Sequence, residues 1–363
     1  MATLLLLGAL FLAFSNGAND NFKGFATVWG SHSLGYRKAL ALATIATIAG
    51  SLASLLLAGD LVQQFSGKGL VPDAVATTPA FIMAVGIGAA VTVIVATRTG
   101  FPISTTHALI GGLVGAGMAT GGGVDLARLG GSFFAPLLIS PVIAAGLGAL
   151  AYSLMRRRRR EADCACIIEA ETLGTPAADG SALAFSAALP RLVVASDATC
   201  DSLTAPGIRF SIARLLDHVH LLSAASICFA RGLNDTPKLA ALLVAAQLSG
   251  MRLSVGLVAL LMAAGGLLLA RRVAETMSLR INHMDATQGV SANLITAALV
   301  IFASRFGMPV STTHVSVGSI AGVGTGAGTV DWPALRHVLL SWVLTLPCAA
   351  GVAWAIATAL HSL

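Results

Sequence analysis

Long hydrophobic runs recur along nearly the whole chain and are separated by short polar connections. A helix needs about 20 mostly apolar residues to cross the hydrocarbon core of a bilayer. Runs of this kind predict helical segments at residues 1–19, 39–58, 80–97, 103–120, 133–155, 212–230, 253–270, 286–304, 310–326 and 335–360. The pattern therefore predicts two membrane domains, residues 1–155 and 211–363, joined by a more polar linker, residues 156–210.

Composition supports a membrane protein. Of 363 residues, 56% are hydrophobic and only 10% are charged, and the mean hydropathy is +0.85. Soluble domains carry about 25% charged residues. We therefore expect an all-α, multi-pass protein that is integral to a lipid bilayer.

The positively charged residues predict how the chain is oriented. The net charge of +6 does not indicate nucleic acid, because the cations gather in short connections such as residues 156–160 and Arg271-Arg272. Such clusters are typical of cytoplasmic loops. With an odd number of segments on each side of a cytoplasmic linker, both termini are expected outside, in a membrane of the bacterial plasma-membrane type.

Two motifs occur once in each half, which predicts an internal duplication. At an offset of 215 (234 − 19), Phe14-x-x-Gly17-x-Asn19-Asp20-x-x-Lys23 recurs as Phe229-x-x-Gly232-x-Asn234-Asp235-x-x-Lys238. At an offset of 207 (311 − 104), Arg98-x-Gly100-x-Pro102-x-Ser104-Thr105-Thr106-His107 recurs as Arg305-x-Gly307-x-Pro309-x-Ser311-Thr312-Thr313-His314. An odd number of crossings turns the second copy over. We expect two inverted-topology repeats of about five segments each, as in many secondary transporters.

The Pro-x-Ser-Thr-Thr-His segments predict two helix starts inside the membrane. Gly100 and Gly307 would end the preceding helices, and Pro102 and Pro309 suit the first turn of a new one. The Ser and Thr residues then lie at N-terminal cap positions, beside free backbone N–H groups that attract anions. Exposed backbone at membrane depth must line a cavity, so broken or re-entrant helices are expected here. Alternatively, the hydroxyls only bond back to their own helices, and His107 and His314 are structural.

Asp20 and Asp235 are the acidic residues that occupy matching positions within the apolar segments. An ionisable side chain at membrane depth indicates function. A carboxylate about 6 Å from an anion repels it by roughly 3 kcal/mol at an effective dielectric constant of about 20. The anion site therefore needs a cation, which could be a proton, a metal ion or a fixed ammonium group.

Together these motifs resemble the inorganic phosphate transporter family, the phosphate permeases. The resemblance covers both halves and leaves only the linker outside. It implies phosphate binding by Ser104, Thr105, Thr106, Ser311, Thr312, Thr313, Asn19 and Asn234. It also implies cation or proton coupling at Asp20 and Asp235, where Na⁺ would bind, with no resident cofactor beyond the co-transported H⁺ or Na⁺.

The chain departs from the family pattern at two matching positions. Where the family usually has Asn, this chain has Lys23 and Lys238. A residue three positions after Asp lies on the same helix face. One hypothesis is that the lysines neutralise Asp20 and Asp235, or contact the anion, where relatives use Na⁺. The alternative is that each lysine marks the aqueous end of its helix and extends to the membrane surface.

The sequence thus favours a secondary active transporter, not an enzyme, that imports inorganic phosphate by H⁺ or Na⁺ symport. A sulfate permease of the same fold and an anion channel are alternatives, and a homodimer is left open as the assembly. A different class is an intramembrane hydrolase that uses Ser104 or Ser311 with His107 or His314. One nucleophile and one base would suffice for that chemistry, so it leaves the duplication unexplained.

Overall fold

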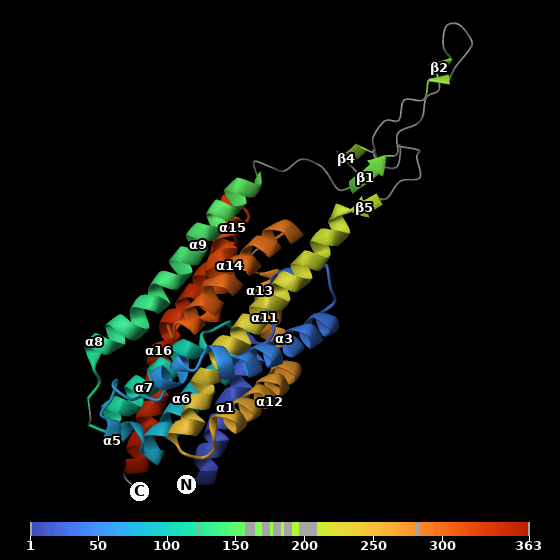
Figure 1. Cartoon of the computed structure of the whole chain (residues 1–363). Coiled ribbons are helices and arrows are strands. Elements are labelled where there is room, and N and C mark those ends of the chain that lie inside the picture. The colour runs from blue at the N-terminus through green and yellow to red at the C-terminus, as the bar shows by residue number, and fades with distance from the viewer. Residues whose placement is uncertain are drawn as a thin grey trace. The chain divides into compact units, whose positions relative to one another are not determined.

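A computed structural model describes residues 2–121, 123–156, 164–168, 175–176, 183–184, 191–195, 209–280 and 284–361. The chain divides into two compact units. One consists of Met1–Ser153 together with His220–Leu363, and the other of Leu154–Val219. The first unit is a bundle of helices, in which the start of α1 and the end of α16 lie toward the same end (Figure 1).

The helices follow the hydrophobic runs of the sequence. In chain order they are α1 (Ala2–Asp20), η1 (Lys23–Phe25), α2 (Ala26–Gly30), α3 (Tyr36–Leu57), α4 (Asp60–Phe65), α5 (Asp73–Ala76), α6 (Pro79–Thr99), α7 (Thr105–Ala119), α8 (Leu126–Arg128), the π-helix η2 (Leu129–Phe134), α9 (Ala135–Arg156), α11 (Ile212–Ala245), α12 (Met251–Leu269), α13 (Arg271–Leu279), α14 (Ala286–Arg305), α15 (Thr312–Ala327) and α16 (Trp332–His361). Each predicted segment coincides with one of these helices. The largest difference is in α11, which continues to Ala245 because polar residues after 230 remain helical and face buried partners.

Short strands occupy part of the predicted linker. Strand β1 (Cys164–Ile168) pairs antiparallel with β4 (Arg191–Ala195) and with β5 (Arg209–Ser211), and β2 (Thr175–Pro176) pairs with β3 (Leu183–Ala184). Cys164 and Cys166 are two residues apart, so they share one face of β1, and both are buried. The sequence pattern did not specify this sheet, because its strands are too short to leave a clear alternation.

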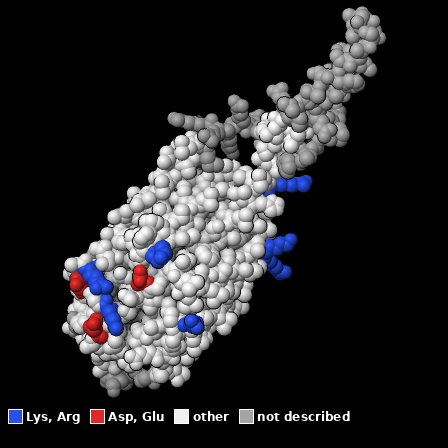
Figure 2. All heavy atoms as spheres, viewed as in Figure 1, with Lys and Arg blue, Asp and Glu red and all other residues white. Residues whose placement is uncertain are grey.

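Seven helical stretches in the described part of the chain are long and apolar enough to cross a membrane. They are Ala2–Gly30, Tyr36–Leu57, Pro79–Thr99, Leu126–Leu154, Met251–Leu269, Ala286–Arg305 and Trp332–His361. Figure 2 shows a face of the molecule on which only a few Lys, Arg, Asp and Glu side chains appear. The chain is therefore a multi-pass membrane protein with an all-α membrane fold, as predicted. Helices α7 and α15, with 15 and 16 residues, are shorter than the about 20 residues that a full span needs.

Glycine lets helices from different halves of the sequence approach closely. A Cβ atom on Gly17 of α1 would lie 1.9 Å from the Met262 carbonyl oxygen of α12, and one on Gly265 of α12 would lie 1.9 Å from the Phe14 carbonyl oxygen of α1. Helices α3 and α11 pack in the same way. There, Cβ atoms on Gly50 and Gly232 would lie 1.9 and 2.1 Å from backbone oxygens of the partner helix. Small residues at such contacts are the usual basis of helix packing in membranes.

Gly265→Ala is expected to destabilise the bundle, because the added methyl group would overlap the backbone of α1. Overpacking of this kind costs about 1–3 kcal/mol. The matched control is Gly256→Ala in the same helix, where an added Cβ has open space within 4 Å. We expect the apparent melting temperature in detergent micelles to fall for Gly265→Ala and to stay level or rise for Gly256→Ala. Equal melting temperatures for the two variants would contradict the close α1–α12 contact.

Candidate functional site

Two helices end immediately before the repeated turns, and glycine makes each ending possible. Helix α6 ends at Thr99 and is followed by Gly100 with φ of 81°, and α14 ends at Arg305 before Gly307 with φ of 64°. Both φ values lie in the left-handed region, which residues with a Cβ atom disfavour. The chain then runs outside helix and strand to the next helix start in both places, and Ser104 and Ser311 have extended backbone conformations.

Serine caps the helix that follows each turn. Ser104 is the N-cap of α7, and its Oγ accepts a hydrogen bond of 3.2 Å from the His107 N–H. Ser311 caps α15 in the same way, with 3.3 Å to the His314 N–H. The prediction that Pro102 and Pro309 lie in the first helical turn is wrong. Because Ser bonds the amide three residues on, the helices begin at Thr105 and Thr312, and the prolines stay in the extended connections.

Asp20 lies at the last residue of α1 and is fully enclosed. It forms an ion pair with Lys23 through Oδ1. Its Oδ2 accepts hydrogen bonds from the Asn16 amide at 3.1 Å and from the Thr105 hydroxyl at 3.1 Å. The N-terminal residue of α7 is thus tied directly to the carboxylate of α1.

Asp235 in α11 is held more loosely. Its Oδ1 accepts a 3.0 Å hydrogen bond from the Asn234 side chain and lies 3.6 Å from Lys238 Nζ. Its Oδ2 lies 3.5 Å from Arg231 Nε and 3.4 Å from the amide nitrogen of Asn16. Asn16 bonds to both Asp20 and Asp235, so one side chain bridges the two carboxylates.

The two lysines connect both turns in the same pattern. Lys23 Nζ donates to the Ile103 carbonyl oxygen at 2.8 Å and to Thr313 Oγ1 at 2.7 Å. Lys238 Nζ donates at 2.7 Å to the carbonyl oxygen of Val310, the counterpart of Ile103, and at 2.9 Å to Thr106 Oγ1, the counterpart of Thr313. Each lysine therefore joins the turn of its own half to the helix start of the other half.

Neither lysine extends to a membrane surface. The exposed fractions of Lys23 and Lys238 are 4% and 1%. The alternative in which each lysine marks an aqueous helix end is therefore wrong, because both ammonium groups lie among buried polar partners. The structure brings each of them to the Asp three residues before it, within α11 for Lys238 and across the end of α1 for Lys23, which begins η1.

The remaining predicted residues lie around this network. Asn19 Nδ2 donates to Thr97 Oγ1 and to the Phe101 carbonyl oxygen, both at 3.0 Å. Asn234 Nδ2 donates to the Val310 carbonyl oxygen at 3.2 Å. Thr312 is buried at the first residue of α15. The asparagines thus hold the extended connections in place, and the hydroxyls lie where the two turns meet.

The two histidines stack on each other. The ring centroids of His107 and His314 are 4.3 Å apart, and the ring planes differ by 11°. Each Nδ1 lies within hydrogen-bond distance of its own capping serine, 3.1 Å for Ser104 and 2.6 Å for Ser311. The stack brings the first turns of α7 and α15 into direct contact.

Sequence reasoning missed Asn16 and Arg231, which lie at equivalent positions of the two copies (231 − 16 = 215). Arg231 is 2% exposed, and its Nη2 donates to Asn16 Oδ1 at 2.5 Å. A search for identities between the copies cannot find a position at which the copies differ. A search for polar differences inside the repeated motif would have found this pair.

The buried charges do not cancel. Among the described residues, the buried Asp, Glu, Lys and Arg side chains are Asp20, Lys23, Arg231, Asp235 and Lys238. At their formal charges, three cations and two carboxylates leave one positive charge. Because a charge inside a membrane protein is costly without a partner, this surplus favours an anion at the site.

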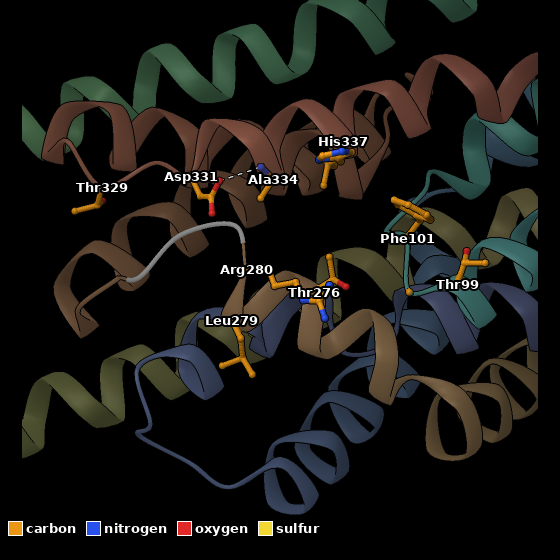
Figure 3. A pocket seen from close by; sticks show the side chains of 11 residues that line it. Thr99, Phe101, Thr276, Leu279, Arg280, Thr329, Asp331, Ala334 and His337 are labelled. Atoms are coloured by element: carbon orange, nitrogen blue, oxygen red, sulfur yellow. Dashed lines mark hydrogen bonds between the residues drawn. The ribbon is translucent and has the colours of Figure 1, made fainter.

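A cavity of about 530 Å³ adjoins the first turn. Gly100 and Phe101 of the turn line it, together with Arg280 after α13 and with Asp331 and His337 near the start of α16 (Figure 3). The Phe101 carbonyl oxygen accepts the hydrogen bond from Asn19. The cavity is therefore lined by a residue whose carbonyl group is bonded to the polar network.

Comparison with known proteins identifies the family of the chain. The sequence model of the phosphate transporter family matches residues 16–353. A Pyrococcus furiosus protein that carries the name phosphate permease is 26% identical, covering 99% of this chain and 96% of its own length. The inorganic phosphate transporter 2-1, chloroplastic, of Arabidopsis thaliana is also 26% identical, covering 96% of this chain and 70% of its own. A solved structure named the sodium-dependent phosphate transporter shares the fold at a TM-score of 0.76 and 20% identity, over 100% of this chain and 99% of its own. Because the family model matches most of its length, the chain belongs to the phosphate transporter family.

Proposed function

We propose that this protein is a secondary active transporter that imports inorganic phosphate together with a cation. The observation that carries the proposal is the meeting of two serine-capped helix starts around a buried network with one surplus positive charge. Helix N-termini and hydroxyls are suited to phosphate oxygens. The family, and the names of its relatives, are those of transporters and not of enzymes.

The transport mechanism proposed is alternating access by two inverted repeats, residues 1–155 and 211–363. Matching contacts between the two halves support this mechanism, because α1 of the first half packs on α12 of the second, and α11 of the second half packs on α3 of the first. The short helices α7 and α15 suit re-entrant segments at the two turns. The start of α1 and the end of α16 lie toward the same end of the bundle, which agrees with both termini on one side of the membrane (Figure 1). We assign that side to the outside and the linker to the cytoplasm.

Residue roles follow from the contacts. Phosphate would bind to Ser104, Thr105, Thr106, Ser311, Thr312 and Thr313, with Asn19 and Asn234 holding the connections. Asp20 and Asp235 would couple uptake to the cation, and Lys23 and Lys238 would neutralise them. Because ammonium groups already pair with both carboxylates, we favour H⁺ over Na⁺ as the coupling ion.

Uptake into proteoliposomes tests this function. Separately imposed proton and Na⁺ gradients should be compared, with labelled phosphate as the substrate and sulfate and arsenate as competitors. We expect accumulation of phosphate above the external concentration under a proton gradient. Gradient-driven uptake of sulfate without phosphate would favour the sulfate permease, and strictly downhill flux would favour a channel.

Ser104→Ala and Ser311→Ala are expected to reduce phosphate uptake by similar factors. Each variant removes a hydroxyl group from the proposed anion site. A hydrogen bond to a charged ligand contributes about 1.5–3 kcal/mol, which corresponds to a fall in phosphate affinity of roughly 10- to 100-fold. Thr78→Ala is the matched control, because Thr78 caps α6 outside the site through a 3.4 Å bond from the Phe81 N–H. Thr78→Ala should lower the stability of the protein without lowering phosphate uptake. A loss of uptake confined to one serine would contradict a site shared by both turns.

A further inference from the structure

The Arg231 guanidinium lies in a cage of oxygen atoms. Its Nη1 donates to Asn21 Oδ1 at 3.2 Å and to Thr47 Oγ1 at 3.4 Å. Its Nη2 donates to the backbone and side-chain oxygens of Asn16, at 3.4 and 2.5 Å. Nε has no hydrogen-bond partner among the described residues but lies 3.5 Å from Asp235 Oδ2. Carboxylate, amide, hydroxyl and backbone oxygens therefore surround one fully buried cation.

This set of oxygens has the chemistry of a site for a hard metal cation. Ions of that class bind to carboxylate, carbonyl and other oxygen ligands, and transporters hold Na⁺ with such groups near the membrane midplane. Here the positive charge belongs to the protein instead. The guanidinium is fixed by covalent attachment to α11 and cannot leave with the substrate.

The equivalent place in the other half offers no second cage. At the offset of 215, Asn16 replaces Arg231, Thr236 replaces Asn21 and Met262 replaces Thr47. Thr236 Oγ1 bonds to Ser51 Oγ at 2.7 Å and lies 3.7 Å from Met262 Sδ. A thioether is a soft ligand and does not suit a hard cation. The oxygen cage thus occurs in one half only, and Arg231 occupies it.

We propose that Arg231 is a tethered cation that takes the place of a bound Na⁺, so that this protein binds phosphate without Na⁺. This inference rests on the proposed function. Arg231 acts through its neighbours: Asn16 links it to Asp20 and Thr105, and Asp235 lies beside it. It is therefore a charge-compensating residue whose removal should change the Na⁺ dependence of anion binding.

The test measures binding of labelled inorganic phosphate to the purified full-length protein, with Na⁺ replaced by N-methylglucamine. For the wild type we expect the same Kd with and without Na⁺. Arg231→Asn copies the residue at position 16. Without Na⁺ it should weaken binding about 10- to 100-fold, the loss expected when a unit charge about 6–12 Å from an anion is removed at an effective dielectric constant of about 20. Added Na⁺ should restore much of that loss, because it can enter the vacated cage.

Two further variants separate charge from packing. Arg231→Lys keeps a cation in the cage and should stay independent of Na⁺. Arg252→Asn, at an exposed arginine of α12, should behave like the wild type. Either of two results would overturn the inference. In one, the wild type needs Na⁺ to bind phosphate. In the other, Arg231→Asn binds phosphate as tightly as the wild type when Na⁺ is absent from both. If Arg231→Asn does not fold, wild-type binding that requires Na⁺ still overturns the inference. Absence of phosphate binding in every buffer would instead contradict the proposed function, and the inference with it.

Discussion

Lys23→Met is expected to lower the free energy of unfolding by about 3–5 kcal/mol, the usual cost of removing one partner from a buried ion pair. Asp20 would keep its charge in an enclosed site, and the bonds from Lys23 to Ile103 and Thr313 would be lost as well. The apparent melting temperature in detergent micelles, measured without phosphate, reports the change.

A double variant identifies the cause. Asp20→Asn combined with Lys23→Met removes both charges, so it should recover most of the stability lost in Lys23→Met. Lys68→Met is the matched control, because Lys68 is exposed, and it should melt with the wild type. If the double variant melts no higher than Lys23→Met, the ion pair is not the reason for the loss.

Asp235→Asn is expected to abolish proton-driven accumulation of phosphate while exchange of phosphate across the membrane continues. Asp235 is the more loosely held carboxylate, with its cationic partners at 3.5 and 3.6 Å, so we assign it the proton. Binding should survive, because the variant removes a negative charge from an anion site.

Two measurements in the same proteoliposomes separate these effects. Accumulation under a proton gradient should fall to background, and exchange of labelled for unlabelled phosphate should persist. Asp217→Asn, at an exposed position of the same helix, is the control for changing an acid in α11. Proton-driven accumulation that continues in Asp235→Asn would show that another group carries the proton.

Much of the membrane fold could be predicted from the sequence, because helix position in a bilayer follows directly from hydrophobic runs. The polar end of α11 could not, since residues such as Arg231 and Asp235 interrupt the apolar run without ending the helix. Most of their hydrogen bonds are made to neighbours that only the tertiary fold supplies. The short strands of residues 164–211 carry too few alternating positions to be recognised.

The candidate site was predictable where the two copies agree. Ser104 and Ser311 appear in matching turns, and the lysines follow the aspartates at one spacing. The contacts between the halves were not predictable, because no sequence pattern places Lys23 beside Thr313 or His107 on His314. Arg231 was missed because the equivalent position in the first half is Asn16, so the comparison of the copies gives no match there.

The mismatch between Asn16 and Arg231 has a consequence for how such a site can be assembled. Two identical subunits about a two-fold axis contain every charged group twice, so the net charge at their centre is always even. The buried charges here sum to one, which is odd. A single surplus charge therefore requires two copies that can change independently, as they can when both lie on one polypeptide. Two unlike copies on one polypeptide can thus match the central charge to one monovalent anion.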